Sequence, residues 1–166
     1  MRERRLLPIQ RPGKEMTDAE RLAAIEEIKV LMARRIRSMD TKDWPLYDTC
    51  HAPDATLDSF GTLPDRHKPA GSIARGKQEI LEMIRKVVDG EVKLTTVHHA
   101  HTPEIEITDP MTAKGVWAME DVLRWPAGAA VNTLQGYGHY HETYRKTEDG
   151  WRIQSSKLTR LRVDIT

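Results

Sequence analysis

The feature that most constrains the fold is a change in hydrophobic periodicity midway along the chain. In the first half, apolar residues recur every three or four positions, which is typical of one face of a helix. This spacing predicts three helices, near 18–40, 43–50 and 76–88. Between the last two, residues 61–76 are rich in Gly and Pro, so we predict a long loop there.

The second half is rich in Val, Ile, Thr, Trp and Tyr, which favour strands. Turn signals divide it into four predicted strands, over 92–108, 113–125, 131–146 and 151–163. Helices followed by consecutive strands indicate an α+β fold in which about three helices pack on one face of a curved antiparallel sheet.

The first predicted helix has a defined start. Thr17-Asp-Ala-Glu20 has the form of a capping box, in which each side chain bonds the backbone N–H of the other residue. Residues 1–15 carry five basic and two acidic side chains and little apolar sequence. We expect them to be a disordered basic tail, with a surface-binding arm as the alternative. Residues 16–166 are of a length suited to a single domain.

Composition excludes two classes of partner. The 26 Lys and Arg residues nearly balance the 25 Asp and Glu residues, so the chain lacks the positive surplus that nucleic-acid binding requires. No stretch approaches the roughly 20 apolar residues of a membrane span. A single cysteine, Cys50, excludes an internal disulfide and fits a reducing compartment. We therefore expect a cytoplasmic protein, with Cys50 as a small buried residue.

One carboxylate interrupts an apolar row in the predicted strand 113–125. Side chains alternate along a strand, so Asp121 shares a face with Trp117, Met119 and Leu123, while Glu120 points the other way. A buried carboxylate must be paired, protonated or in contact with a wet cavity. Two interpretations stay open: a structural salt bridge to a neighbouring strand, and a functional acid that lines a cavity.

The first helix carries two further charged residues near its apolar face. Arg35 lies at the edge of the stripe, and Asp40 lies at the C-terminal end, where a negative charge opposes the helix dipole. Two interpretations of Asp40 stay open. The segment Asp40-Thr-Lys-Asp43 caps the following turn, or Asp40 belongs to a functional site.

Five of the seven histidines fall in the predicted sheet, and four of them form two His-x-His pairs, His99/His101 and His139/His141. Neutral imidazole suits proton transfer near neutral pH, and the paired spacing also suits zinc. Surface histidines that make ordinary hydrogen bonds are the third interpretation. The pair Gly136/Gly138 lacks the remainder of a dinucleotide-binding motif, and we interpret these glycines as permitting strand bending.

Several segments, taken in order and spacing over residues 17–163, resemble the SnoaL-like branch of the nuclear transport factor 2-like superfamily. They are Ala24-Ile-Glu-Glu-Ile28, Ser38-Met-Asp40 with Asp43-Trp44, Ala74-Arg-Gly-Lys-Gln-Glu-Ile80, His98-His-Ala-His-Thr-Pro-Glu-Ile105, and Tyr140-x-Glu142-x-Tyr144 with Asp149-Gly-Trp151-Arg-Ile153. Within that branch the segments resemble the group that contains scytalone dehydratase, bile-acid 7α-dehydratase and hexachlorocyclohexane dehydrochlorinase. The resemblance implies a cone-shaped (cystatin-like) sheet with an internal apolar pocket, and a homodimer or homotrimer.

The resemblance also implies a site. Asp40 and His98 match the catalytic dyad of the group, in which imidazole removes a carbon-bound proton and the carboxylate orients it. Asp121 and Arg160 match pocket residues of the bile-acid dehydratase. Arg35 stands where the dehydratases have a tyrosine and the dehydrochlorinase a lysine, which weakens the case for dehydration. The expected substrate-binding residues are three charged ones and two aromatic ones: Arg35, Asp121, Arg160, Trp117 and Tyr140.

We therefore predict a lyase or isomerase that needs no cofactor or metal and acts on a hydrophobic cyclic, steroid- or polyketide-like molecule. The alternative is a non-catalytic ligand-binding or subunit-assembly module of the same fold. A zinc site on the His-x-His pairs is the third hypothesis.

Overall fold

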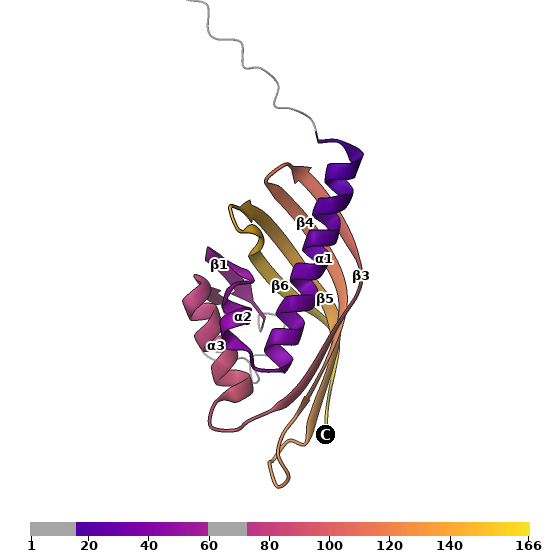
Figure 1. The fold of residues 1–166 in the computed structure, drawn as a ribbon. Coiled ribbons are helices and arrows are strands. Elements are labelled where there is room, and N and C mark those ends of the chain that lie inside the picture. Colours follow the sequence, from indigo (N-terminus) through magenta and orange to yellow (C-terminus); the bar gives the residue numbers. More distant parts are fainter. Residues whose placement is uncertain (1–15, 60–72) are drawn as a thin grey trace, which may run out of the picture.

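The computed structural model describes residues 16–59 and 73–166. In these ranges the elements follow the order α1 (Asp18–Asp40), α2 (Trp44–Asp48), β1 (His51–Asp58), β2 (Ile73–Arg75), α3 (Lys77–Asp89), β3 (Thr95–Asp109), β4 (Thr112–Arg124), β5 (Thr133–Thr147) and β6 (Gly150–Ile165) (Figure 1). The three helices and four long strands confirm the predicted pattern. The predicted tail and most of the predicted loop lie outside the described residues. Strands β1 and β2 were not predicted, and β2 occupies the end of the predicted loop.

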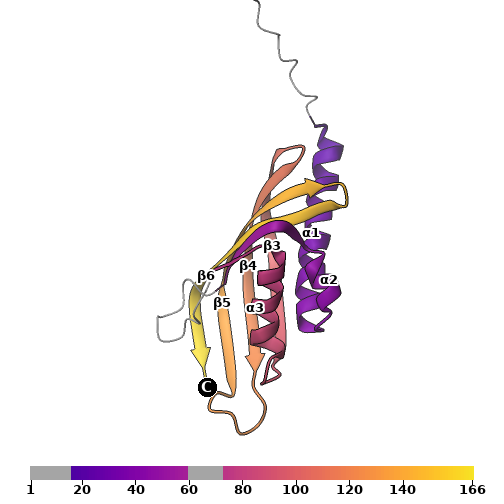
Figure 2. The same ribbon diagram turned by 90° about the vertical axis from the view of Figure 1, so that its left-hand side faces the viewer.

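The six strands form one open sheet in the order β2-β1-β6-β5-β4-β3. The four predicted strands pair antiparallel, as expected, and β2 pairs antiparallel with β1. Strand β1, which was not predicted, runs parallel to β6. The sheet curves, and the three helices lie on one of its faces (Figures 1 and 2). We call this the inner face and the opposite one the outer face.

Helix α1 begins at the predicted capping box. The Thr17 hydroxyl accepts from the backbone N–H of Glu20, and the Glu20 carboxylate accepts from the backbone N–H of Thr17. The buried face of the helix contains two polar residues besides apolar ones, Arg35 and Ser38. The Ser38 hydroxyl donates to the carbonyl of Arg35 at 2.9 Å, which leaves Arg35 as the charged side chain that α1 carries into the interior.

Two apolar clusters fill the space between the helices and the sheet. One lies between α1 and strands β3–β6 and includes Ile28, Trp117 and Tyr140. The other lies among the end of α1, α2, α3, β1 and β2 and includes Met39 and Ile84. Cys50 is fully buried and reduced, as expected. Within the described ranges, no helix has the length and apolar character needed to span a membrane.

Candidate active site

Asp40 and His98 form a hydrogen-bonded pair where the end of α1 packs against β3. His98 Nδ1 lies 2.6 Å from Asp40 Oδ1, and the backbone N–H of His98 donates to Asp40 Oδ2 at 2.9 Å. The Thr96 hydroxyl donates to Asp40 Oδ1 at 2.8 Å. In the tautomer whose Nδ1–H donates to the carboxylate, Nε2 keeps a free lone pair, which is the arrangement that a general base requires.

The same geometry decides between the two interpretations of Asp40. The helix ends at Thr41, which provides the C-cap, and the side chain of Asp43 caps α2 by accepting from the backbone N–H of Leu46. Asp40 therefore caps neither helix, and its carboxylate forms hydrogen bonds with His98 and Thr96.

Asp121 is buried on β4 and is bound by Arg160 of β6. Arg160 donates through both terminal nitrogens, with Nη1 2.7 Å from Oδ1 and Nη2 2.7 Å from Oδ2. In the sheet register, Asp121 lies directly beside His98 of the neighbouring strand. Asp121 therefore has the partner that a buried carboxylate requires, because a bidentate ion pair with arginine satisfies both of its oxygens.

Gly136 makes this ion pair possible. Strand β5 separates β4 from β6, and Gly136 lies opposite Asp121 in the register. A Cβ atom at Gly136 would lie 2.0 Å from Arg160 Nη1 and 2.4 Å from Asp121 Oδ1, so the guanidinium crosses β5 where a side chain is missing. The predicted bending role fits Gly138, beside which the β5–β6 register shifts. Sequence reasoning missed the spatial role of Gly136.

Arg35 lies in the interior and is paired with Glu142 of β5. Arg35 Nη1 donates to Glu142 Oε1 at 3.0 Å, and the guanidinium carbon lies 4.8 Å from the ring centre of Tyr140. Burial alone would lower the pKa of Arg35, but the carboxylate of Glu142 and nearby phenols raise it. Arg35 is therefore a fixed cation at the edge of the site.

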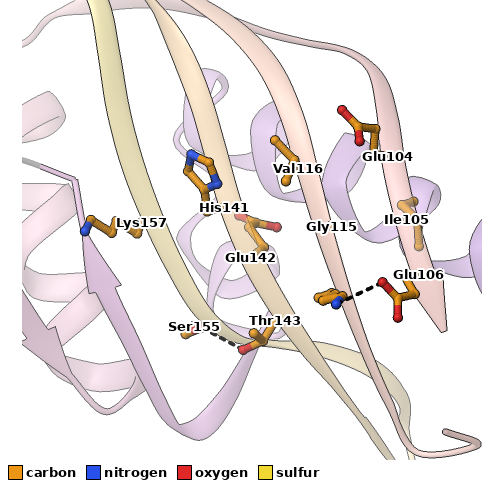
Figure 3. A pocket seen from close by; sticks show the side chains of 11 residues that line it. Glu104, Ile105, Glu106, Gly115, Val116, His141, Glu142, Thr143, Ser155 and Lys157 are labelled. Carbon is orange, nitrogen blue, oxygen red and sulfur yellow. Dashed lines mark hydrogen bonds and ion pairs between the residues drawn. The ribbon is translucent and has the colours of Figure 1, made fainter. Parts of the chain in front are cut away.

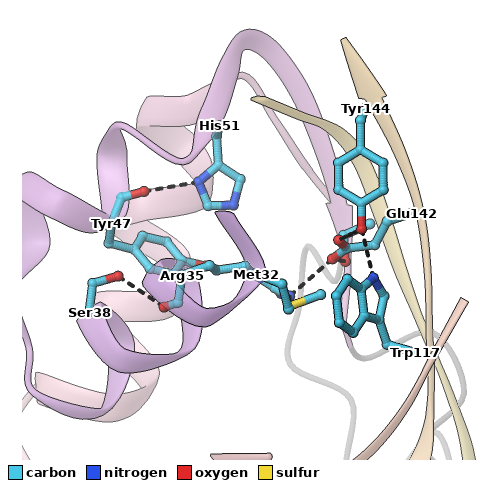
Figure 4. Close-up of polar contacts among 9 residues, drawn as sticks. Met32, Arg35, Ser38, Tyr47, His51, Trp117, Glu142 and Tyr144 are labelled. Atoms are coloured by element: carbon cyan, nitrogen blue, oxygen red, sulfur yellow. Dashed lines mark hydrogen bonds and ion pairs between the residues drawn. The ribbon is translucent and has the colours of Figure 1, made fainter. Parts of the chain in front are cut away.

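Glu142 is the anchor of a buried hydrogen-bond network (Figure 4). Besides Arg35, it accepts from the hydroxyl of Tyr144 at 2.6 Å and from that of Ser156 at 2.9 Å. Trp117 in turn donates through its indole N–H to the Tyr144 hydroxyl at 2.7 Å. Sequence reasoning missed Glu142, although the alternation Tyr140-x-Glu142-x-Tyr144 places a carboxylate in an apolar row, as it does for Asp121.

A cavity of about 70 Å³ lies between the two apolar clusters and brings the predicted residues together. Its polar lining contains Arg35, Ser59, His98, Asp121, Tyr140 and Arg160. Its apolar lining contains Met39, Ile84, Val87, Val88, Leu123 and Leu158. Asp40 stands behind His98, and Trp117 lies outside the lining, in the core. The volume equals that of about two water molecules, well below the 300 Å³ or so of ordinary ligand pockets.

The His-x-His pairs lie on the outer face of the sheet, away from this cavity. His99 Nδ1 lies 2.9 Å from Glu120, and His141 Nε2 lies 3.0 Å from the Thr159 hydroxyl. Over residues 16–59 and 73–166, no three His, Cys, Asp or Glu side chains gather as metal ligands. The pairs match the interpretation as surface histidines, and the zinc hypothesis gains no support.

The outer face also carries a hollow of about 610 Å³ across β3–β6 (Figure 3). Its lining includes Lys114, which pairs with Glu106 at 2.9 Å, and Thr143, whose hydroxyl contacts that of Ser155 at 2.6 Å. Neither member of the Asp40–His98 pair reaches it. His98 therefore lines the smaller inner cavity and not this larger surface hollow.

Two further polar residues, Tyr47 and His51, are buried near Arg35. His51 Nδ1 contacts the carbonyl of Tyr47 at 3.2 Å, and the two rings lie 4.8 Å apart. Burial lowers the pKa of His51 to about 3, and the nearby Arg35 adds to this effect. The Tyr47 hydroxyl and His51 Nε2 have no hydrogen-bond partner in the described structure. His51 is thus a neutral interior histidine outside the candidate site.

The chain belongs to the SnoaL-like domain family, whose model matches residues 20–157. It is 30% identical over 137 residues to the probable cyclase FGR4 of Gibberella zeae, covering 78% of this chain and 85% of that protein. The hexachlorocyclohexane dehydrochlorinase LinA-type3 of Novosphingobium barchaimii superimposes with a TM-score of 0.74 at 14% identity, over 90% of this chain and 94% of that one. A scytalone dehydratase-like protein of Novosphingobium aromaticivorans gives 0.75 at 14% identity, over 89% and 91%. These similarities confirm the family and the nuclear transport factor 2-like fold.

Proposed function

We propose that the protein is a cofactor-independent lyase or isomerase in which His98 removes a carbon-bound proton from a neutral cyclic substrate. The observation that carries this proposal is the 2.6 Å contact between Asp40 and His98, with His98 in the cavity wall. Asp40 fixes the ring and its tautomer, and it stabilises the imidazolium that forms when Nε2 takes the proton. Thr96 holds the carboxylate in this orientation.

The charges around the cavity favour an uncharged substrate. Arg160 gives both terminal nitrogens to Asp121, and Arg35 is paired with Glu142. Each guanidinium charge is therefore already balanced by a carboxylate, and a substrate carboxylate or phosphate would add an unbalanced negative charge to the interior unless it displaced one of these partners. A neutral molecule needs no such exchange, and the apolar lining provides its contacts.

The names of the relatives support elimination as the reaction type. A dehydratase and a dehydrochlorinase both remove a small molecule from a carbon skeleton, and both match this chain in fold. A cavity that binds benzene has a volume of about 150 Å³, so the lining of the 70 Å³ cavity would have to move apart even for one small ring. A steroid- or polyketide-sized molecule would need a much larger displacement of the lining, which favours a small ring as the substrate.

The proposal can be tested with a small neutral probe, β-acetoxycyclohexanone. Removal of the proton between the carbonyl and the ester-bearing carbon expels acetate and gives cyclohexenone, which is followed by its ultraviolet absorbance. We expect the wild-type protein to catalyse this reaction and His98→Gln to lose at least about 100-fold in kcat/KM. Asp40→Asn should lose activity as well.

The matched control is His99→Gln, because His99 is the neighbouring histidine but lies on the outer face with Glu120. This variant should retain wild-type turnover. Full activity in a folded His98→Gln protein, or equal losses in both histidine variants, would show that His98 is not the base.

A further inference from the structure

An elimination needs a proton donor as well as a base when the leaving group is hydroxide. The two guanidinium groups of the cavity wall are held in ion pairs, Arg35 with Glu142 and Arg160 with Asp121, and an arginine does not give up its proton near neutral pH. Two hydroxyl groups remain in the lining, those of Ser59 and Tyr140. A phenol is far more acidic than an aliphatic alcohol, so Tyr140 is the better donor.

Tyr140 is positioned for this role by its surroundings. The residue is 3% exposed and lines the cavity. Its ring packs under the guanidinium of Arg35, at 4.8 Å. A cation over the ring face favours the phenolate that forms when the proton leaves.

The charge of Arg35 is balanced by Glu142 through the 3.0 Å ion pair. Burial raises the pKa of Tyr140, while Arg35 acts in the opposite direction. The phenol therefore carries its proton at neutral pH, and the cation needed to stabilise its loss is already in place.

We propose that Tyr140 is the general acid of the site and protonates the departing hydroxyl group of a β-hydroxy carbonyl substrate. This inference rests on the proposed function. His98 Nε2 takes the carbon-bound proton, and its electron pair forms the new C=C bond. The C–O bond breaks, and the departing oxygen takes the Tyr140 proton to leave as water. Exchange with solvent then returns the proton from His98 to the bulk and reprotonates Tyr140.

The test compares two leaving groups on one ring, in β-hydroxycyclohexanone and β-acetoxycyclohexanone. Hydroxide leaves only with a proton, whereas acetate leaves without one. Tyr140→Phe keeps the ring and its contact with Arg35 but removes the donor. We expect kcat/KM to fall at least about 100-fold for the hydroxy ketone and by less than about 3-fold for the acetoxy ketone.

The acetoxy reaction also reports that the variant is folded and that the base still works. Tyr137→Phe is the matched control, since Tyr137 lies on the outer side of the same strand, opposite Glu120, and should leave both reactions unchanged. Equal losses on both probes, or no loss on either, would overturn the role of Tyr140. A wild-type protein that turns over neither probe, or a fully active His98→Gln variant, would instead overturn the proposed function and this inference with it.

Discussion

Gly136→Ala tests whether the Arg160–Asp121 pair depends on a missing side chain in β5. A Cβ atom at this position would lie 2.0 Å from Arg160 Nη1 and 2.4 Å from Asp121 Oδ1, distances that no relaxed contact tolerates. The flexible Arg160 side chain is the part that can move, so we expect the methyl group to displace it. Asp121 then remains buried without its partner.

The structure sets the size of the effect. The Asp121 side chain is only 5% exposed and that of Arg160 12%, so breaking the pair should cost about 3–5 kcal/mol. For a domain of this size that corresponds to a fall of roughly 6–20 °C in Tm. Chemical denaturation followed by circular dichroism measures the free energy of unfolding directly.

Gly115→Ala is the matched control on the same inner face of the sheet. Its nearest contact would be Tyr144 at 3.3 Å, so the neighbours need to move only slightly, and the expected cost is below about 1 kcal/mol. In a background of Asp121→Ala with Arg160→Ala, the cost of Gly136→Ala should fall to the same level. Equal costs for the two glycine substitutions, or an undiminished cost in that background, would refute the reasoning.

Three further predictions follow from the polar contacts. Thr96→Val removes one donor to Asp40 and should lower kcat/KM for β-acetoxycyclohexanone about tenfold, with little change in KM. Glu142→Gln leaves the buried Arg35 charge without its counter-ion and should lower the free energy of unfolding by about 3 kcal/mol or more. The folded protein keeps His51 neutral down to about pH 3, whereas the unfolded chain protonates it near pH 6.5. The free energy of unfolding should therefore fall by up to about 5 kcal/mol as the pH drops from 6.5 to about 3. The fall should be less steep in the His51→Gln variant.

Each of these has an outcome that contradicts it. An unchanged rate for the Thr96 variant would mean that the two contacts from His98 suffice to hold Asp40. A Glu142 variant as stable as the wild type would show that Arg35 finds another partner. If the slopes of stability against pH were the same with and without His51, other groups would account for the acid sensitivity.

Periodicity predicted most of the secondary structure because it reports local geometry. The stripe on α1, the capping box at Thr17 and the alternation in β4 each depend on residues within a few positions of one another. Strand β2, three residues long, carries no comparable signal. The parallel pairing of β1 with β6 depends on how distant segments meet, so it had no local signature.

For the site, the sequence indicated which residues were anomalous but not which partners they had. Asp121 and Arg35 stood out as charges among apolar residues, and the resemblance singled out Asp40 and His98. The same alternation marks Glu142, yet only the fold shows that it pairs with Arg35 across 107 positions of the chain.

The sequence by itself determined the order of the three helices and the four long strands, the place of Asp121 in an apolar row, and the resemblance to the family. Tertiary structure alone decided the rest: the meeting of α1 with β3, the passage of Arg160 over Gly136, and the narrow cavity. The physical reason is that hydrophobic period and capping are properties of neighbouring residues, whereas an ion pair or a cavity depends on the relative placement of segments far apart in the chain. Three polar pairs, contributed by α1, β3, β4, β5 and β6, come together only when the sheet curves around the helix.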